Sequence, residues 1–176
     1  MAVGDSDAAY NLGVLYETGV VHLNQRILSA DMFMALKYFL IASKSNHTPS
    51  DLRLGTIYLV SEEYQDYPKA LSYLTRAANN DDADAMNLLG QMKELGIGND
   101  ESSIPDYISA RFWYKKAYHK GHLGAMFNLG NLYECGVGGV EKDFERALKF
   151  YSKAATQGHQ DSIDRLIDLR EMEDDE

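Results

Sequence analysis

The chain has 176 residues, of which 45% are hydrophobic and 25% are charged, an ordinary balance for one soluble domain with a buried core. Seventeen Lys and Arg stand against 27 Asp and Glu, and the formal net charge of −10 disfavours nucleic acid and anionic membrane surfaces as partners. No apolar run approaches the roughly 20 residues that span a bilayer, so we expect no membrane insertion. The single cysteine, Cys135, excludes an internal disulfide and favours a reducing, cytoplasmic location. A luminal location stays open if the chain was excised from a larger protein of the secretory pathway.

The sequence contains an internal repeat whose clearest marker is the dipeptide Leu-Gly, found at intervals of 42, 35 and 40 residues. The four copies are Leu12-Gly13, Leu54-Gly55, Leu89-Gly90 and Leu129-Gly130. A small residue lies five positions before each glycine, and a tyrosine or lysine lies three positions after it. Because residues three or four apart share one face of a helix, each copy predicts a short amphipathic first helix.

A second helix is predicted downstream of each first helix. It starts at an aspartate four residues before an alanine, and a large aromatic residue follows three residues after that alanine. The aspartates are Asp31, Asp66, Asp106 and Asp143, and the aromatic residues are Tyr38, Tyr73, Trp113 and Phe150. Since an aspartate accepts hydrogen bonds from the free backbone N–H groups of a helix N-terminus, we expect the four aspartates to be N-caps.

A glycine inside a helix costs about 1 kcal/mol relative to alanine. Its recurrence at one place in four first helices therefore needs a compensating contact. We expect the bare Cα to leave room for the aromatic ring of the second helix, so that small and large residues interdigitate. The expected pairs are Gly13 with Tyr38, Gly55 with Tyr73, Gly90 with Trp113 and Gly130 with Phe150.

These units predict an all-α fold over residues 1–170, an α-solenoid of about four antiparallel helix pairs with a C-terminal capping helix. The expected repeats cover about 5–46, 47–82, 83–121 and 122–159, the capping helix covers 160–170, and an acidic tail covers 171–176. The links between helices vary in length, as surface loops do, and the longest runs from Gly19 to Asp31. Residues 1–3 resemble the end of a missing second helix, so we expect the chain to be excised from a longer array or to pack on a preceding segment.

The segments Tyr10–Gly19 and Phe127–Gly138, with residues 149–155, resemble the Sel-one-like repeat (SLR) family. Ser50, Ser61 and Lys93 depart from its pattern. The resemblance covers nearly the whole chain and implies a right-handed α-solenoid, related to tetratricopeptide repeats, that holds protein complexes together. Known members of the family include adaptors of endoplasmic-reticulum degradation ligases, chitin-synthase activators, the C-terminal region of elongation-factor-two kinase, and bacterial adaptors.

Residue types that support catalysis or metal binding occur in this sequence, but not in the patterns that such chemistry needs. His47, His122 and His159 occupy one repeat position, a full repeat apart, so we interpret them as turn residues and not as ligands of one metal ion. The glycines after Cys135 follow a predicted helix instead of joining a strand to a helix, which indicates a helix C-cap and not a phosphate loop. Cys135 is expected to be a buried or half-buried packing residue. We therefore expect no enzymatic activity, cofactor or metal.

A hydrolase acting through its own groove is a further hypothesis, because some SLR proteins have been linked to β-lactam binding. The sequence disfavours it, since it has no Ser-x-x-Lys motif and no paired cysteines.

The first helices of paired-helix solenoids line the concave surface, where we expect a partner peptide or helix to bind. Positions −2, +1 and +4 relative to the repeated glycine form a stripe that varies between units while the core positions stay constant. The stripe consists of Asn11, Val14, Glu17, Arg53, Thr56, Leu59, Leu88, Gln91, Glu94, Asn128, Asn131 and Glu134. The predicted function is a non-catalytic protein-interaction scaffold or adaptor. The alternative is a regulatory or substrate-recruiting C-terminal domain of a larger enzyme, for example of a kinase or a ubiquitin-ligase complex.

Overall fold

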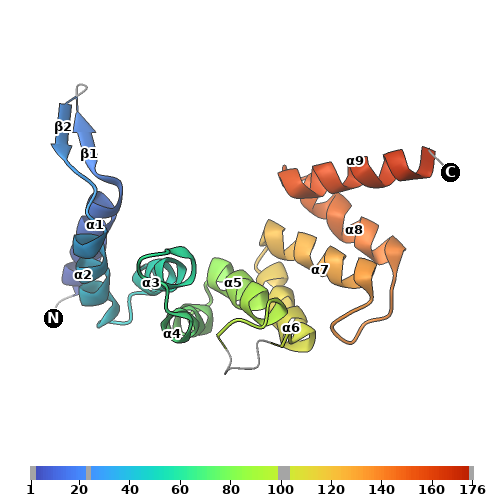
Figure 1. Cartoon of the computed structure of the whole chain (residues 1–176), viewed down its shortest axis with the longest axis horizontal. Helices are drawn as coiled ribbons and strands as arrows, with labels where there is room; N and C mark the ends of the chain where they lie inside the picture. The colour runs from blue at the N-terminus through green and yellow to red at the C-terminus, as the bar shows by residue number, and fades with distance from the viewer. Residues whose placement is uncertain (1–2, 23–24, 99–103, 175–176) are drawn as a thin grey trace. The chain divides into compact units, whose positions relative to one another are not determined.

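The computed structural model describes residues 3–22, 25–98 and 104–174 (Figure 1). The helices of this part of the chain are α1 (Val3–Thr18), α2 (Met32–Ser43), α3 (Thr48–Val60), α4 (Tyr67–Asn79), α5 (Ala83–Glu94), α6 (Tyr107–His119), α7 (Leu123–Cys135), α8 (Phe144–Ala155) and α9 (Gln160–Asp174). Two short strands, β1 (Val20–His22) and β2 (Gln25–Leu28), lie between α1 and α2. We call α1, α3, α5, α7 and α9 the A helices, and α2, α4, α6 and α8 the B helices.

The chain divides into two compact units, residues 1–82 and 83–176. The first unit contains the helix pairs α1–α2 and α3–α4, and the second contains α5–α6 and α7–α8 followed by α9. Within each unit every A helix packs along the B helix of its own pair, and the next A helix packs against that B helix in turn. The predicted helical-repeat class, with pairs of helices followed by a single one, is confirmed.

The four aspartate N-caps are also confirmed. Each accepts a hydrogen bond from the backbone N–H three residues further on, as in Asp31 with Met34 at 3.0 Å and Asp143 with Arg146 at 2.9 Å. The same holds for Asp66 at the start of α4 and Asp106 at the start of α6. These caps fix where each B helix begins, independently of the length of the preceding loop.

The repeated histidines are N-caps of A helices, a structural role as predicted. His122 Nδ1 accepts a hydrogen bond from the backbone N–H of Ala125 at 3.0 Å, while its Nε2 lies 3.1 Å from Asp84 Oδ1 in the preceding A helix. His47 forms the corresponding cap of α3, and its Nε2 lies 3.0 Å from Asp7 Oδ1. Each of these imidazoles therefore bridges two successive A helices of one unit. No group of three or more His, Cys, Asp or Glu side chains in the described residues is placed to hold a metal ion.

The close approach at the repeated glycines is confirmed, but its predicted partners are wrong by one residue. A Cβ placed on Gly13 would lie 2.6 Å from Phe39 Cδ1, and one on Gly130 would lie 2.7 Å from Tyr151 Cδ1. Gly55 meets Leu74 and Gly90 meets Tyr114 in the same way. We call Phe39, Leu74, Tyr114 and Tyr151 the notch residues; all four are fully buried.

Three of the aromatic residues expected at the glycines lie beside them instead, against the tyrosines of the A helices; these are Tyr38, Tyr73 and Phe150. Tyr38 stacks on Tyr16 with ring centroids 5.5 Å apart, and Phe150 stacks on Tyr133 at 5.7 Å. Positions three and four residues after the repeated alanine both lie on the packed side of a B helix, so helical periodicity alone does not separate them. The residue four positions after the repeated alanine lies directly in line with it along the helix, and its side chain packs against the bare Cα of the repeated glycine.

Three further expectations about chain segments need correction. The link from Gly19 to Asp31 was expected to be a loop, yet β1 and β2 pair antiparallel within it. Residues 1–3 were expected to end a preceding second helix, but α1 already begins at Val3, while residues 1 and 2 lie outside the described residues. The capping helix α9 continues past Arg170 into the acidic run and ends at Asp174. A fourth correction concerns a single residue: Cys135 was expected to be buried or half-buried, but it is exposed at the end of α7.

Candidate functional site

The predicted stripe on the A helices is partly assembled by packing within each unit. In the first unit, Arg53 Nη1 lies 3.9 Å from Glu17 Oε1 of the preceding A helix. In the second unit, Asn128 Nδ2 donates a hydrogen bond to Asn87 Oδ1 at 3.0 Å. Two stripe positions of successive A helices, Arg53 and Glu17, are therefore neighbours in the first unit. The contact in the second unit joins Asn128 of the stripe to Asn87, the residue before the stripe residue Leu88.

Several polar side chains of the stripe have partners inside the protein. The Tyr151 hydroxyl lies 2.7 Å from both Asn131 Oδ1 and Glu134 Oε2, and Glu134 also accepts hydrogen bonds from Arg165. The Tyr114 hydroxyl donates in the same way to Glu94. Burial, with the nearby carboxylate adding to it, raises the pKa of both tyrosines well above the usual range, so both hydroxyls stay protonated donors. The stripe stays a prediction as a partner surface, and part of its polarity serves the helix pairs themselves.

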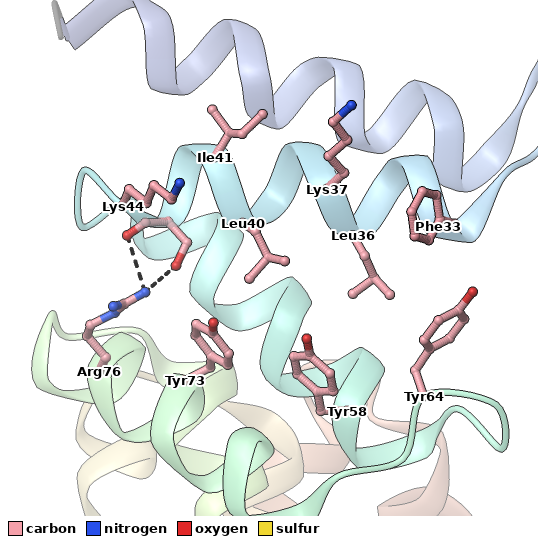
Figure 2. A pocket seen from close by; sticks show the side chains of 11 residues that line it. Phe33, Leu36, Lys37, Leu40, Ile41, Lys44, Tyr58, Tyr64, Tyr73 and Arg76 are labelled. Atoms are coloured by element: carbon pink, nitrogen blue, oxygen red, sulfur yellow. Dashed lines mark hydrogen bonds between the residues drawn. The ribbon is translucent and has the colours of Figure 1, made fainter.

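A second candidate surface is a groove in the first unit, between α2 on one side and α3 with α4 on the other. Its volume is about 720 Å³, within the range of roughly 300–1,000 Å³ that ligand pockets occupy. We call it the α2–α4 groove, and it is lined by Phe33, Leu36, Lys37, Leu40, Ile41, Ser43, Lys44, Tyr58, Tyr64, Tyr73 and Arg76. Figure 2 shows Leu36 and Leu40 pointing from α2 toward the row of tyrosines on the opposite wall.

The aromatic wall of the groove is held in place from both sides. Tyr58 and Tyr73 stack with ring centroids 5.8 Å apart and an interplanar angle of 11°. Lys69 Nζ lies 5.2 Å from the Tyr58 centroid, and the Arg76 guanidinium carbon lies 5.3 Å from the Tyr73 centroid. Cation–π contacts of this kind restrict the rings, so the wall is preformed.

A buried polar cluster closes one end of the groove. Asp51 is fully buried, accepts a hydrogen bond from Ser43 Oγ at 2.7 Å, and forms a two-point ion pair with Arg76. Arg76 Nη2 also donates to the Ser43 carbonyl oxygen and hydroxyl, which are the dashed contacts in Figure 2. The hydrogen bonds that Arg76 donates to Asp51 raise the pKa of Arg76 further, so this guanidinium is a fixed positive charge.

The groove is open because Ser43 is small. Tyr118 occupies the corresponding position of α6, eight residues after the repeated alanine. Its ring lies 5.5 Å from the Phe150 ring, and its hydroxyl accepts a hydrogen bond from Lys153 at 2.9 Å. The second unit thus fills with an aromatic ring the space between successive B helices that the first unit leaves open.

The polar cluster, like Ser43, is present in the first unit and replaced by other residues in the second. In the second unit, Met126 and Lys153 occupy the positions that Asp51 and Arg76 occupy in the first. A small hydroxyl residue with an ion pair in one unit corresponds to a tyrosine, a methionine and a lysine in the other. The alignment of repeats contains this signal at the outer positions of the B helices, whereas the predicted partner surface lies on the A helices alone.

Helix pairs packed in series define the class of helical-repeat proteins. The sequence identifies one family within this class. Four segments of the chain match the Sel1 repeat, namely residues 6–47, 49–82, 83–122 and 124–159. The chain belongs to the Sel1 repeat family, which confirms the resemblance drawn from its sequence.

Curated relatives are mostly much longer than this chain. It is 30% identical to the chitin synthase regulator SKT5 of Saccharomyces cerevisiae, with 90% of the chain and 22% of that protein aligned. It is 32% identical to protein SHC1 of the same yeast, with 96% of the chain and 33% of that protein aligned. The chain therefore spans between about a fifth and a third of these relatives.

Solved structures confirm the solenoid fold. The SLR-fold protective antigen c5321 of uropathogenic Escherichia coli is 29% identical with a TM-score of 0.80, covering 93% of this chain and 33% of its own. A Sel1 repeat protein from Oxalobacter formigenes is 28% identical with a TM-score of 0.78, covering 90% of this chain and 59% of its own. In the described residues, no helix has the length and apolarity needed to cross a membrane.

Proposed function

We propose that this chain is a non-catalytic protein-interaction module, and that the α2–α4 groove binds an apolar side chain from a segment of a partner protein. The observation that carries the proposal is the groove itself. It has a volume of about 720 Å³ and apolar and aromatic walls, and the small Ser43 keeps it open. The names of relatives such as a chitin synthase regulator support a binding role over a catalytic one. The cytoplasmic location expected from the single thiol stays a prediction.

The composition of the groove suits protein binding. Tyrosine, phenylalanine and arginine are the residue types enriched where interfaces concentrate their binding energy. Phe33 is 68% exposed at the rim, so a partner would remove a large apolar surface from water. Because Tyr58, Tyr73 and Arg76 are already fixed by stacking and by the ion pair, binding orders few new side chains.

The A-helix stripe remains a second proposed surface for the same function. Its best test uses positions without internal hydrogen bonds in the described structure, such as Asn11 and Gln91. Asn131→Ala is a poor choice, since it also removes a partner of Tyr151.

A regulatory or substrate-recruiting domain within a larger protein is the second candidate function. Two relatives favour it, because the segment aligned with this chain is a minor part of each protein's length. SKT5 is one example, and the ERAD-associated E3 ubiquitin-protein ligase component HRD3 of Candida glabrata is another, 30% identical over 12% of its length. The two functions share the same binding event and differ in what the rest of the protein does.

The test is selection of binding peptides from a random display library, followed by titration of the selected peptides. Leu40→Trp fills the groove, and Ser72→Trp adds the same ring to the exposed side of α4, away from the groove, as the matched control. We expect Leu40→Trp to weaken binding by about tenfold or more, and Ser72→Trp to leave it within about twofold. Circular dichroism checks that both variants stay folded.

A second plugging variant has a precedent within the chain. Ser43→Tyr with Asp51→Met and Arg76→Lys copies the filled arrangement of the second unit. It should abolish binding of the same peptides. Peptides that bind wild type, Leu40→Trp and the triple variant equally would refute the groove as the site.

A further inference from the structure

Charges are sorted between the two sets of helices. The B helices contain nine of the 17 Lys and Arg residues and a single acidic residue, Glu145. The A helices contain four Lys and Arg residues against 13 Asp and Glu residues. The net charge of −10 is therefore a poor guide to the B helices. Since the Debye length is about 8–10 Å at physiological ionic strength, a partner there responds to the local sign of charge.

The α2–α4 groove lies on this basic side. Lys37 and Lys44 line it, both are exposed, and neither has an ion-pair partner among the described residues. The aspartates of the surrounding elements are already engaged. Asp31 and Asp66 cap α2 and α4, and Asp51 is buried against Arg76. The positive charges of Lys37 and Lys44 are thus not neutralised by these aspartates.

The opposite end of the groove has the other sign. Tyr64 lines that end, and a hydrogen bond with Glu63 raises the pKa of its hydroxyl, which places the Glu63 carboxylate beside it. Glu62 is exposed in the same turn. Figure 2 shows Lys44 and Arg76 at one end of the groove, and Phe33 and Tyr64 at the other, with the leucines between them.

We propose that the α2–α4 groove binds a peptide segment carrying an acidic residue on one flank of its apolar anchor, and that the carboxylate lies at the Lys44 end. This inference rests on the proposed function and specifies its partner. The anchor would lie between the leucines of α2 and the tyrosine wall, and Lys44 would meet the carboxylate. Glu62 and Glu63 would repel an acidic residue on the other flank, so the groove also sets the direction of the segment.

Surface shape and charge favour a peptide over a broad anionic surface. A nucleic-acid strand or an anionic bilayer presents charge along its whole length, and would face both the lysine end and the Glu62–Glu63 end. A short segment with one acidic flank matches both ends at once.

The test measures sequence preference and charge reversal in the peptides selected above. We expect Asp or Glu to be enriched on one flank of a Leu, Phe or Trp anchor. Lys44→Glu should lower the affinity for these peptides by about tenfold. Replacing the acidic residue of the peptide with lysine should restore binding to the Lys44→Glu variant. Lys115→Glu, an exposed lysine of α6 in the second unit, is the matched control and should change affinity by less than about twofold, because it tests the net charge alone.

The outcomes separate this inference from the proposed function. Peptides that lose affinity for Leu40→Trp but show no acidic preference, or are unaffected by Lys44→Glu, would overturn the acidic partner and leave the groove as the binding site. Equal losses for Lys44→Glu and Lys115→Glu would also overturn it, since net charge would then explain the effect. Peptides indifferent to Leu40→Trp would overturn both.

Discussion

Gly130→Ala is the most direct probe of the packing that joins A and B helices. The new Cβ would lie 2.7 Å from Tyr151 Cδ1 and 2.9 Å from its Cζ. Favourable carbon contacts lie at about 3.5–4.0 Å, so the ring would have to move by roughly 1 Å. Tyr151 has no free space for that movement, because it is fully buried and its hydroxyl is held by Asn131 and Glu134.

Two opposing terms set the magnitude. Overpacking of this kind costs about 1–3 kcal/mol, while replacing a helical glycine with alanine contributes about 1 kcal/mol of stabilisation. We expect a net loss of about 1 kcal/mol, which lowers Tm by roughly 2–4 °C in a protein of this size. Thermal denaturation followed by circular dichroism measures it.

A double-mutant cycle tests the cause. In a Tyr151→Ala background the ring is gone, so Gly130→Ala should become neutral or stabilise by up to about 1 kcal/mol. The change of sign is the signature of a notch filled by the ring. A Gly130→Ala variant that melts above wild type would refute the reasoning, because the helix-propensity gain would then be unopposed.

Other substitutions test the caps and ion pairs. Asp143→Ala should lower the free energy of unfolding by about 1 kcal/mol and Asp143→Asn by much less, both measured by urea denaturation, because asparagine still caps the helix. Asp51→Ala should cost about 3 kcal/mol in the same assay, since it leaves Arg76 without its buried partner; a loss below about 1 kcal/mol would contradict that role. Burial raises the pKa of Glu134, but the hydrogen bonds from Arg165 and Tyr151 outweigh it and hold this pKa below its usual value of 4.5. Its stabilising effect is therefore present above about pH 4.5 and is lost as the pH falls through the lowered value, so wild type should lose more stability on acidification than Glu134→Gln.

The elements that the sequence predicted well are those set by local chemistry. An aspartate cap depends on a side chain and a backbone N–H three residues apart, so Asp31 and Asp143 are visible in the sequence before any tertiary contact is known. The repeated glycine likewise indicates a close approach wherever the companion helix lies. Its partner was misassigned because Tyr38 and Phe39 both lie on the packed side of α2, and only the contact with α1 separates them.

The groove was not predicted because it depends on how α2 packs against the following helix pair and not on a repeated position alone. Self-comparison emphasises positions that recur, whereas the position eight residues after the repeated alanine varies: it is Ser43 in the first repeat, Tyr118 in the third, and alanine in the second and fourth. The hairpin was missed for a related reason, since among the described residues only the first unit contains it. The link contains apolar residues that suit paired strands, namely Val20, Val21, Ile27 and Leu28. They were overlooked because the long link was interpreted as a loop.

The notch residues and the glutamates at the ends of the A helices bear on how this chain could be rebuilt. Tyr114 is served by Glu94, and Tyr151 by Glu134. The second repeat has leucine at both corresponding places, Leu74 and Leu59. Three of the four repeats thus contain a matched pair, and a unit moved as a whole into a longer array would carry both halves of it. The first repeat differs, because its notch residue Phe39 has no hydroxyl and Glu17 lies near Arg53 instead. Exchanging one half alone would strand either a buried hydroxyl or a carboxylate.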